Sequence, residues 1–370
     1  MTPSSRRGLV LALVLCAGTG RMLSAQDSPF GINGLGVPGR PESARARATG
    51  GAFAMFDPFS GLAEVALTAN SQLSANAVGA VSYITDELGG ESATRRSTRF
   101  PLFQISGPAW GGVVIGGGFS SYLDRSYRVS LTDTIVLGGS QQQVTDVLSN
   151  DGGVSDLRVV AAKRFGALAL GAGFHLLSGS SRLLASRTFT DTSTYRGVTE
   201  TDEVAYRGTG ISASAMLSVG RSLRITGFAR SDTHLRSELN AVEVARNDLP
   251  TTVGGGVYLQ VTPEVALATS LIHTSWSVAA DSDAFNTTVW SAGGEFGNRR
   301  HPLRIGVCGG QLPFGPGGTA PREFTISAGT GIIFAQGRGI IDVSIERQRR
   351  TGAGLVETLY TGLFGITVRP

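Results

Sequence analysis

From about residue 98 to the C-terminus, apolar and polar side chains alternate in segments of about ten residues. The segments come in pairs, each joined by a short turn, and a long polar loop separates one pair from the next. The turns of the clearest pairs centre on Arg164, Arg221, Pro263, Arg300 and Gly337. Alternation with a period of two is typical of β-strands with one apolar face. Short turns on one rim and long loops on the other predict an up-and-down antiparallel transmembrane β-barrel.

Following these turns along the chain predicts about fourteen strands, an even number as in bacterial barrels. The predicted strands span residues 76–85, 98–106, 111–120, 157–164, 167–177, 204–219, 222–231, 250–261, 265–276, 286–296, 302–310, 322–334, 339–347 and 357–368. Long polar loops are expected at residues 141–155, 179–203, 232–247, 278–283, 311–321 and 348–354. The fold class is therefore all-β, and the barrel predicts the outer membrane of a Gram-negative-type bacterium.

The alternation also predicts which side chains face lipid. In the strand from Leu223, apolar residues alternate with a set that includes Arg224 and Arg230. A charge at the bilayer midplane would cost a few kcal/mol, so the arginine set is expected to face the lumen. The residues expected inside by this argument are Arg224, Thr226, Phe228, Arg230, Arg304, Asp342, Ser344 and Glu346. The lumen should therefore hold charges of both signs.

The first 25 residues are typical of a secretory signal peptide. Arg6 and Arg7 precede an apolar run, and small residues before Gln26 offer a cleavage site. Cys16 raises the alternative of a lipid anchor, but Leu15 before it is bulkier than such signals usually allow. We therefore expect a cleaved signal over residues 1–25, with Gln26 near the mature N-terminus.

Composition narrows the class of protein. Many of the 52 glycines fall inside the predicted strands, where they ease curvature and close packing. Cys308 alone follows the expected cleavage site, so an intrachain disulfide is not expected. Three of the 32 basic residues precede that site, which leaves 29 against 28 acidic residues and a net charge near +1. This balance does not indicate nucleic-acid binding. Beyond the signal no apolar run approaches the roughly 18 residues of a membrane helix.

The segment before the first strand is predicted to fill the barrel. A fourteen-strand barrel has a lumen too wide for its own side chains to fill. Residues 26–75 are rich in Gly, Ala, Pro and Phe, with helical patches at 42–48 and 60–69. A separate domain of this size would be marginally stable. We therefore expect a plug at 26–75, followed by the barrel at 76–370.

The chain resembles the FadL-type outer-membrane transporters of long-chain fatty acids and other hydrophobic compounds. Three stretches carry the resemblance, and together they cover about a third of the chain. They are Ala48 to Ala54 with Asp57-Pro58 and Gly61 to Ala63; Glu264 to Trp276; and, in the last seventy residues, Pro302 to Gly306, Leu312 to Phe314, Glu323, Gly329 to Gly331, Ile341-Asp342, Glu346, Arg350 and Glu357. Two features depart from the family pattern. Glu64-Val65-Ala66 stands where the hatch has Asn-Pro-Ala, and the chain ends on Pro370 instead of an aromatic residue.

The resemblance implies passive import through an apolar pocket behind the plug. The residues expected to line this pocket are Phe53, Phe56, Phe59, Leu62 and Phe119. In this family the ligand leaves sideways through a gap where the third strand kinks inward. Here Gly116, Gly117 and Gly118 are the expected lateral gate, because consecutive glycines allow a strand to bend. The alternative is that these glycines only permit curvature.

Enzymatic function is not expected. The histidines, His175, His234, His273 and His301, lie on separate predicted strands or turns, and none has a histidine partner at metal-ligand spacing. We therefore predict no catalytic site, metal or cofactor, and a monomer in outer-membrane lipid that binds a hydrophobic small molecule. Two alternatives to import remain open, a diffusion porin for polar solutes and a non-transporting scaffold or secretion accessory on the same fold.

Overall fold

The structure is a computed structural model that describes residues 28–70, 72–279, 284–298, 300–315 and 318–370. The predicted signal peptide and most of the predicted loop at 278–283 lie outside these residues. Within the described residues, no helix is long and apolar enough to cross a bilayer.

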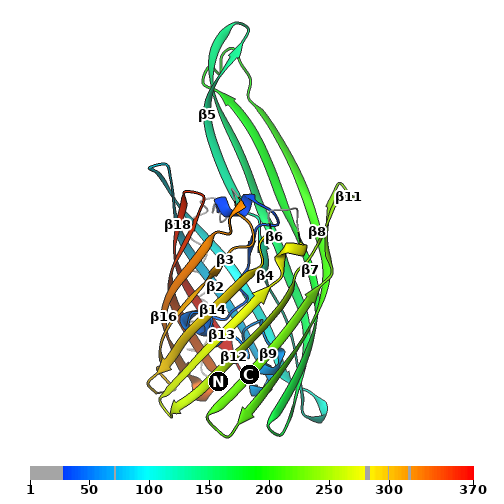
Figure 1. The fold of residues 1–370 in the computed structure, drawn as a ribbon, viewed down its shortest axis with the longest axis vertical. Coiled ribbons are helices and arrows are strands. Elements are labelled where there is room, and N and C mark those ends of the chain that lie inside the picture. Colours follow the sequence, from blue (N-terminus) through cyan, green and yellow to red (C-terminus); the bar gives the residue numbers. More distant parts are fainter. Residues whose placement is uncertain (1–27, 71, 280–283, 299, 316–317) are drawn as a thin grey trace, which may run out of the picture.

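Fourteen antiparallel strands form a closed barrel, as the sequence predicted (Figure 1). The barrel strands are β2 (Ser74–Leu88), β3 (Glu91–Pro108), β4 (Val113–Asp124), β6 (Ser140–Phe165), β7 (Leu168–Phe189), β8 (Val198–Val219), β9 (Leu223–Asp232), β12 (Thr251–Thr262), β13 (Val265–Thr274), β14 (Thr287–Phe296), β15 (Leu303–Gln311), β16 (Arg322–Phe334), β17 (Gly339–Gly352) and β18 (Leu355–Val368). Each strand pairs with the next in this order, and β18 pairs with β2 to close the sheet. Closure leaves no unpaired sheet edge in the barrel wall.

The predicted inward and outward faces are confirmed. Leu303 is 57% exposed and Ile345 is 65% exposed, whereas Arg304 and Glu346 are 4% exposed. The outward set is apolar and the inward set is polar or charged, which suits a wall with lipid on one side. This apolar outer face and the closed sheet identify the chain as an outer-membrane barrel.

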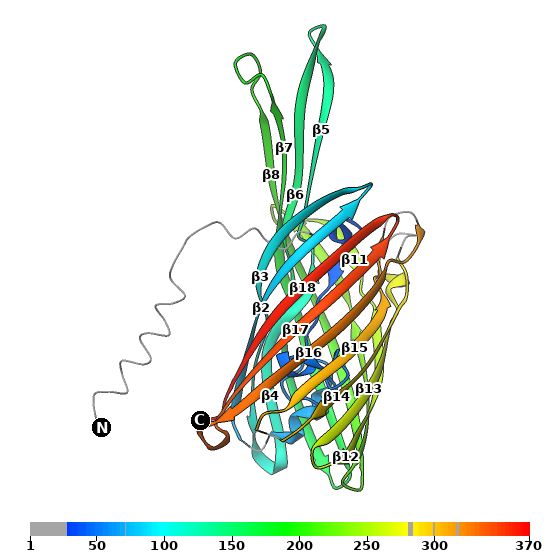
Figure 2. The ribbon, with the colours of Figure 1, turned by 90° about the vertical axis from the view of Figure 1, so that its left-hand side faces the viewer.

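Four of the predicted long loops are wrong, because strands occupy most of their residues; in the loop predicted at 348–354, for example, β17 continues to Gly352 and β18 begins at Leu355. β6, β7 and β8 extend beyond the rim, where β5 (Tyr127–Leu137) pairs with β6. The predicted loop at 232–247 contains a smaller hairpin of β10 (His234–Leu239) and β11 (Val242–Asp248). Figures 1 and 2 show the long hairpins rising above the barrel. We call this extension, residues 127–150 and 183–203, the projecting sheet.

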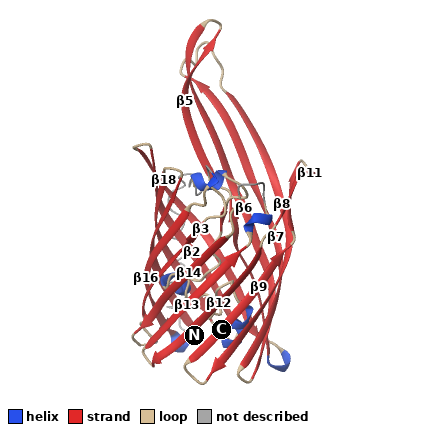
Figure 3. Ribbon diagram, in the orientation of Figure 1, coloured by secondary structure: helices blue, strands red, loops and turns tan. Residues whose placement is uncertain are grey.

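Residues 28–70, the N-terminal segment, lie within the barrel (Figure 2). The segment is mostly turns, as Figure 3 shows, with η1 (Pro29–Ile32), β1 (Val37–Pro38), α2 (Ala44–Ala48) and η2 (Glu64–Ala69) as its short elements. α2 contacts β15 to β18, η2 contacts β4 and β6 to β8, and β1 pairs with β4. Apolar side chains such as Phe53 and Val65 are almost fully buried as a result.

Candidate functional site

The first half of the N-terminal segment is attached to the wall by one buried and one partly buried ion pair. Arg47 of α2 donates from Nε to Oε1 of Glu346 on β17 at 2.6 Å, and its Nη2 contacts the other carboxylate oxygen. Arg45 of α2 pairs with Glu295 on β14 at 3.1 Å. Just after the helix, Thr49 lies so close to β15 that a Cβ on Gly306 would come within 2.0 Å of it. Glycine is therefore required at that wall position.

The second half is attached through one carboxylate. Glu64 of η2 accepts hydrogen bonds from the hydroxyls of Ser212 and Ser214 on β8, both at 2.5 Å. The opposing strand β7 has Gly171 and Gly173 here, where added Cβ atoms would lie 2.8 Å from Glu64 Cβ and 3.2 Å from its Oε1. These small wall residues allow η2 to approach the sheet closely.

The wall brings together a serine, a histidine and an aspartate that sequence reasoning had left apart. His175 Nδ1 lies 2.9 Å from both carboxylate oxygens of Asp156, and His175 Nε2 lies 2.8 Å from Ser212 Oγ. The three residues come from the adjacent strands β6, β7 and β8, and all are buried. Their spacing resembles that of a hydrolase triad.

The surroundings of Ser212 do not resemble a hydrolase site. Its hydroxyl donates to Glu64, and its backbone is paired within the sheet to Gly173 on one side and Arg230 on the other. A backbone held in a ladder offers no oxyanion hole next to the nucleophile. We therefore interpret the serine, histidine and aspartate as a hydrogen-bonded chain that links the wall to the N-terminal segment.

This chain continues to an arginine on β9. Arg230 donates from Nη1 to Asp156 at 2.7 Å and from Nε to Asp232 at 2.9 Å. Its guanidinium carbon lies 4.9 Å from the ring centroid of Tyr122, whose hydroxyl also donates to Asp232 at 2.9 Å. Two carboxylates and one aromatic ring therefore fix the plane of this guanidinium.

A cavity of about 220 Å³ lies between the N-terminal segment and this part of the wall, and we call it the upper cavity. Charged and polar side chains of the hydrogen-bonded chain line one part of it. Apolar side chains line another part, namely Leu62, Phe228, Ile272, Trp276 and Leu312. An apolar cavity of about 150 Å³ can hold benzene, so the upper cavity has room for one ring and a small substituent.

Two further cavities lie toward the short-turn rim, with volumes of about 330 Å³ and 180 Å³. Arg224 and Arg369 border both, and these cations lie over the rings of Tyr258 and Phe59. A hollow of about 1360 Å³ lies over lipid-facing side chains such as Ile305 and is therefore a feature of the outer surface.

The predicted ligand residues do not form one pocket. Leu62 borders the upper cavity, Phe59 borders the cavity of 330 Å³, and Phe53 and Phe56 border the cavity of 180 Å³. Phe53 and Phe56 also pack against Tyr258, with ring centroids 5.6 Å apart in each case. They therefore belong to the apolar contact that seats the segment.

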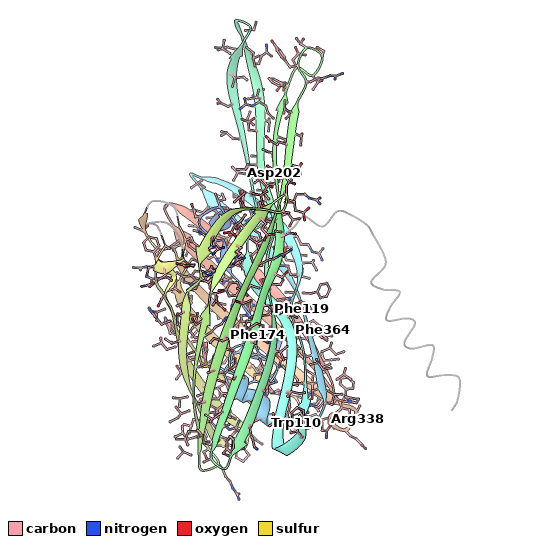
Figure 4. The ribbon with its side chains drawn as sticks, turned by 90° about the vertical axis from the view of Figure 1, so that its right-hand side faces the viewer. Trp110, Phe119, Phe174, Asp202, Arg338 and Phe364 are labelled. Atoms are coloured by element: carbon pink, nitrogen blue, oxygen red, sulfur yellow. The ribbon has the colours of Figure 1, made fainter. Side chains whose placement is uncertain are left out.

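Phe119 requires a correction. It is 38% exposed and stacks on Phe103 of the neighbouring strand, on the outer face of the wall. Figure 4 shows its position on the barrel wall together with Phe174 and Phe364. Phe119 does not line the lumen, because it shares its face of β4 with Ile115, which is 45% exposed, and both precede the irregularity between Ser121 and Leu123.

The expected break in the sheet is not seen at the three glycines. Gly116 to Gly118 pair with β3 on one edge and with β6 on the other, and the irregularity of β4 lies later, between Ser121 and Leu123. A Cβ on Gly116 would lie 3.3 Å from Leu67 of η2, and one on Gly118 would lie 2.2 Å from the carbonyl oxygen of Phe103. Close approach explains these glycines in the structure, and their role as a gate stays a prediction.

The projecting sheet carries an apolar stripe above the lumen. Val129 of β5 pairs with Leu148 of β6, on the face that points into the lumen lower down, and Leu131 follows on the same face. These three side chains are between 40% and 59% exposed. Exposed apolar side chains at this position suit contact with a hydrophobic molecule.

Comparison with known proteins gives matches in structure alone: no protein-family model matches the sequence, and no curated protein matches it. The toluene transporter TodX of Pseudomonas putida is 13% identical, with a TM-score of 0.58 over 91% of this chain and 98% of that one. The toluene transporter TbuX of Ralstonia pickettii is 14% identical, with a TM-score of 0.55 over 92% and 99%. The monoaromatic hydrocarbon channel CymD is 12% identical, with a TM-score of 0.56 over 91% and 98%. The chain therefore has the fold of the FadL-type outer-membrane channels.

Proposed function

We propose that this protein imports hydrophobic molecules the size of a single aromatic ring across the outer membrane. The observation that carries the proposal is the upper cavity of about 220 Å³, enclosed between the barrel wall and the N-terminal segment. Its volume suits one ring far better than a long acyl chain. The similar structures of the toluene transporters TodX and TbuX and of the monoaromatic hydrocarbon channel CymD support the same class of substrate.

Uptake measurements test this proposal. Cells that produce the protein in their outer membrane should take up radiolabelled toluene faster than cells with an empty vector. The protein should increase the uptake of a long-chain fatty acid much less. Equal uptake of toluene with and without the protein would contradict import. Faster uptake of small sugars would instead favour the polar porin, which the filled lumen makes the weaker alternative.

We also propose that the N-terminal segment is the plug. Deleting residues 28–69 removes no barrel strand, so insertion and heat-modifiable gel mobility should be kept. The deletion should raise ion conductance in planar bilayers, because the lumen of a fourteen-strand barrel is wide. Unchanged conductance would mean that the segment is not the barrier.

For exit we propose sideways release through the wall at β4. An outer groove of about 730 Å³, lined by Gly116, Gly117 and Ile115, covers this part of the wall. Because β4 is fully paired here, release would require it to separate from β6. In a Cys308→Ser background, Ile115→Cys and Ala161→Cys, which occupy partner positions, would lock the two strands by a disulfide.

Oxidation of this pair should stop toluene uptake, and reduction should restore it. The matched control is Leu217→Cys with Ile225→Cys, partner positions on β8 and β9 that also face lipid. Uptake that survives complete oxidation of the β4–β6 pair would exclude this exit. A non-transporting scaffold would show no uptake under any of these conditions.

A further inference from the structure

Three residues that line the upper cavity have a buried polar atom without a hydrogen-bond partner in the part of the chain that the structure describes, namely Arg40 Nη1, Glu42 Oε2 and Arg230 Nη2. The first two lie near opposite charges, because Arg40 Nη1 is 3.6 Å from Glu346 and Glu42 Oε2 is 3.3 Å from Arg40 Nε. Within the described residues, Nη2 of Arg230 is buried and has no hydrogen-bond partner. The other polar groups of the hydrogen-bonded chain are engaged: both ring nitrogens of His175, both oxygens of Asp156 and the hydroxyl of Tyr122. Beside the hydrogen-bonded chain, the unmet requirement is therefore an acceptor for Nη2 of Arg230.

The direction of this donor is fixed. Asp156 and Asp232 hold the other two nitrogens of the Arg230 guanidinium, and the ring of Tyr122 lies against its face. A planar guanidinium held in this way cannot rotate to find another partner. A bound molecule that offers an acceptor would thus meet a preorganised donor, with little entropy lost on binding.

The charges around the cavity favour a neutral ligand. Arg40, Arg230 and Arg350 line it, but so do the four carboxylates of Glu42, Glu64, Asp156 and Glu323. The arginines are already paired with acidic groups: Arg40 lies 3.3 Å from Glu42, and Arg350 donates to Glu323 at 2.8 Å. An anionic ligand would meet four carboxylates and three arginines, and these arginines already have acidic partners. It would therefore be repelled.

We propose that the upper cavity selects neutral single-ring molecules that carry a hydrogen-bond acceptor, which Arg230 recognises through Nη2. The apolar lining that includes Phe228 and Ile272 would hold the ring, and the oxygen of a ketone, ether or phenol would accept from the guanidinium. This inference rests on the proposed import of single-ring molecules and specifies the substrate class. Hydrogen bonds to charged donors discriminate strongly against analogues that lack the acceptor.

Binding to the detergent-purified full chain tests the proposal with three ligands of similar shape. Acetophenone offers a carbonyl acceptor, isopropylbenzene has a methyl group in its place, and benzoate adds a charge. We expect acetophenone to bind about tenfold or more tightly than isopropylbenzene, and benzoate to bind more weakly than acetophenone. Equal or weaker binding of acetophenone relative to isopropylbenzene would overturn the acceptor requirement but leave hydrocarbon import intact.

Variants assign the preference to one residue. Arg230→Lys keeps a positive charge beside Asp156 and Asp232 but removes the planar guanidinium with its several N–H donors. The ratio of the affinities for acetophenone and isopropylbenzene should therefore fall to about one. Arg350→Lys is the matched control, because Arg350 lines the same cavity, also joins two carboxylates, and has no unpartnered buried nitrogen among the described residues. A preference that survives Arg230→Lys would refute the role of Arg230.

Heat-modifiable mobility reports whether each variant is folded, and the ligand series on the unchanged protein stands without any variant. If none of the three aromatic ligands binds and none is taken up by cells, the proposed function itself fails. That outcome is distinct from binding without an acceptor preference, which overturns the selectivity alone.

Discussion

The ion pair between Arg47 and Glu346 provides a direct test of how the N-terminal segment is held. The Glu346 side chain is 1% exposed and that of Arg47 is 10% exposed, so both charges depend on each other for stabilisation. Arg47→Ala would leave the carboxylate buried with Arg40, 3.6 Å away, as its one ion-pair partner among the described residues. Breaking a buried pair costs about 3–5 kcal/mol, and the remaining arginine places this case near the lower end.

A loss of about 3 kcal/mol would raise the ratio of displaced to seated segment on the order of 100-fold. Single-channel recordings in planar bilayers should then show frequent openings where the unchanged protein shows few. Because no barrel strand is altered, heat-modifiable mobility should stay normal. Arg47→Leu combined with Glu346→Leu removes both charges and should recover much of the seating, since the buried charge is no longer unpaired.

The control is Arg246→Ala, which breaks an exposed pair with Glu243 on the small hairpin outside the barrel. Exposed pairs contribute little, so conductance should not change. If the Arg47→Ala variant opens no more often than the unchanged protein, while the variant with Arg47→Leu and Glu346→Leu opens frequently, the ion pair does not hold the segment. The apolar contacts would then have to account for its position in the lumen.

Two further predictions concern close packing and pH. Gly306→Ala should open the channel in the same bilayer recordings, because the added Cβ would lie 2.0 Å from the backbone of Thr49 and overpacking costs about 1–3 kcal/mol. Gly362→Ala is the control: its added Cβ, on the outer face, would meet nothing within 4 Å, and conductance should not change. In the projecting sheet, a hydrogen bond from Arg187 lowers the pKa of Asp146. The pair should therefore stabilise the sheet at pH values above the ordinary pKa of aspartate, and this stabilisation should be lost as the pH falls through the lowered pKa. An NMR titration of Asp146 should show the lowered pKa, and Arg187→Ala should return it toward its ordinary value.

The sequence predicted the barrel well because its wall obeys a rule of period two. The membrane demands apolar side chains outside, and the packed lumen demands small or polar ones inside, so each strand carries its orientation in its own residues. Phe119 was assigned to the wrong face despite this rule. Ser120 next to it is polar and faces inward, so the alternation alone would have placed Phe119 toward lipid.

The projecting sheet was missed because its polar residues favoured long loops, and a sequence typical of turns lies among them. Residues 150–153 read Asn-Asp-Gly-Gly, yet β6 runs through them without a turn. A Cβ on Gly152 would lie 2.1 Å from the carbonyl oxygen of Ser180, and one on Gly153 would lie 2.2 Å from that of Leu123. The glycines allow three strands to crowd together where the sheet leaves the barrel, and no local pattern distinguishes that need from a turn.

The hydrogen-bonded chain could not be predicted because it depends on register. Alternation places Asp156, His175 and Ser212 on the lumen side, but their heights relative to one another depend on how the three strands are paired. That pairing is set by the short turns at the other rim, at Phe165 and Gly220. An uncertainty of two residues in either turn would move each partner out of hydrogen-bond distance.

The two attachments of the N-terminal segment differ in what surrounds them. α2 is held by ion pairs to Glu346 and Glu295, whereas η2 is held by Glu64, which shares Ser212 with His175 and so with the lining of the upper cavity. Among the described residues, continuous hydrogen bonds join the second attachment to the cavity and not the first. A ligand that changes the hydrogen bonding of Arg230 acts on the same chain that seats η2, so we expect ligand-dependent movement to begin at η2 while α2 stays attached.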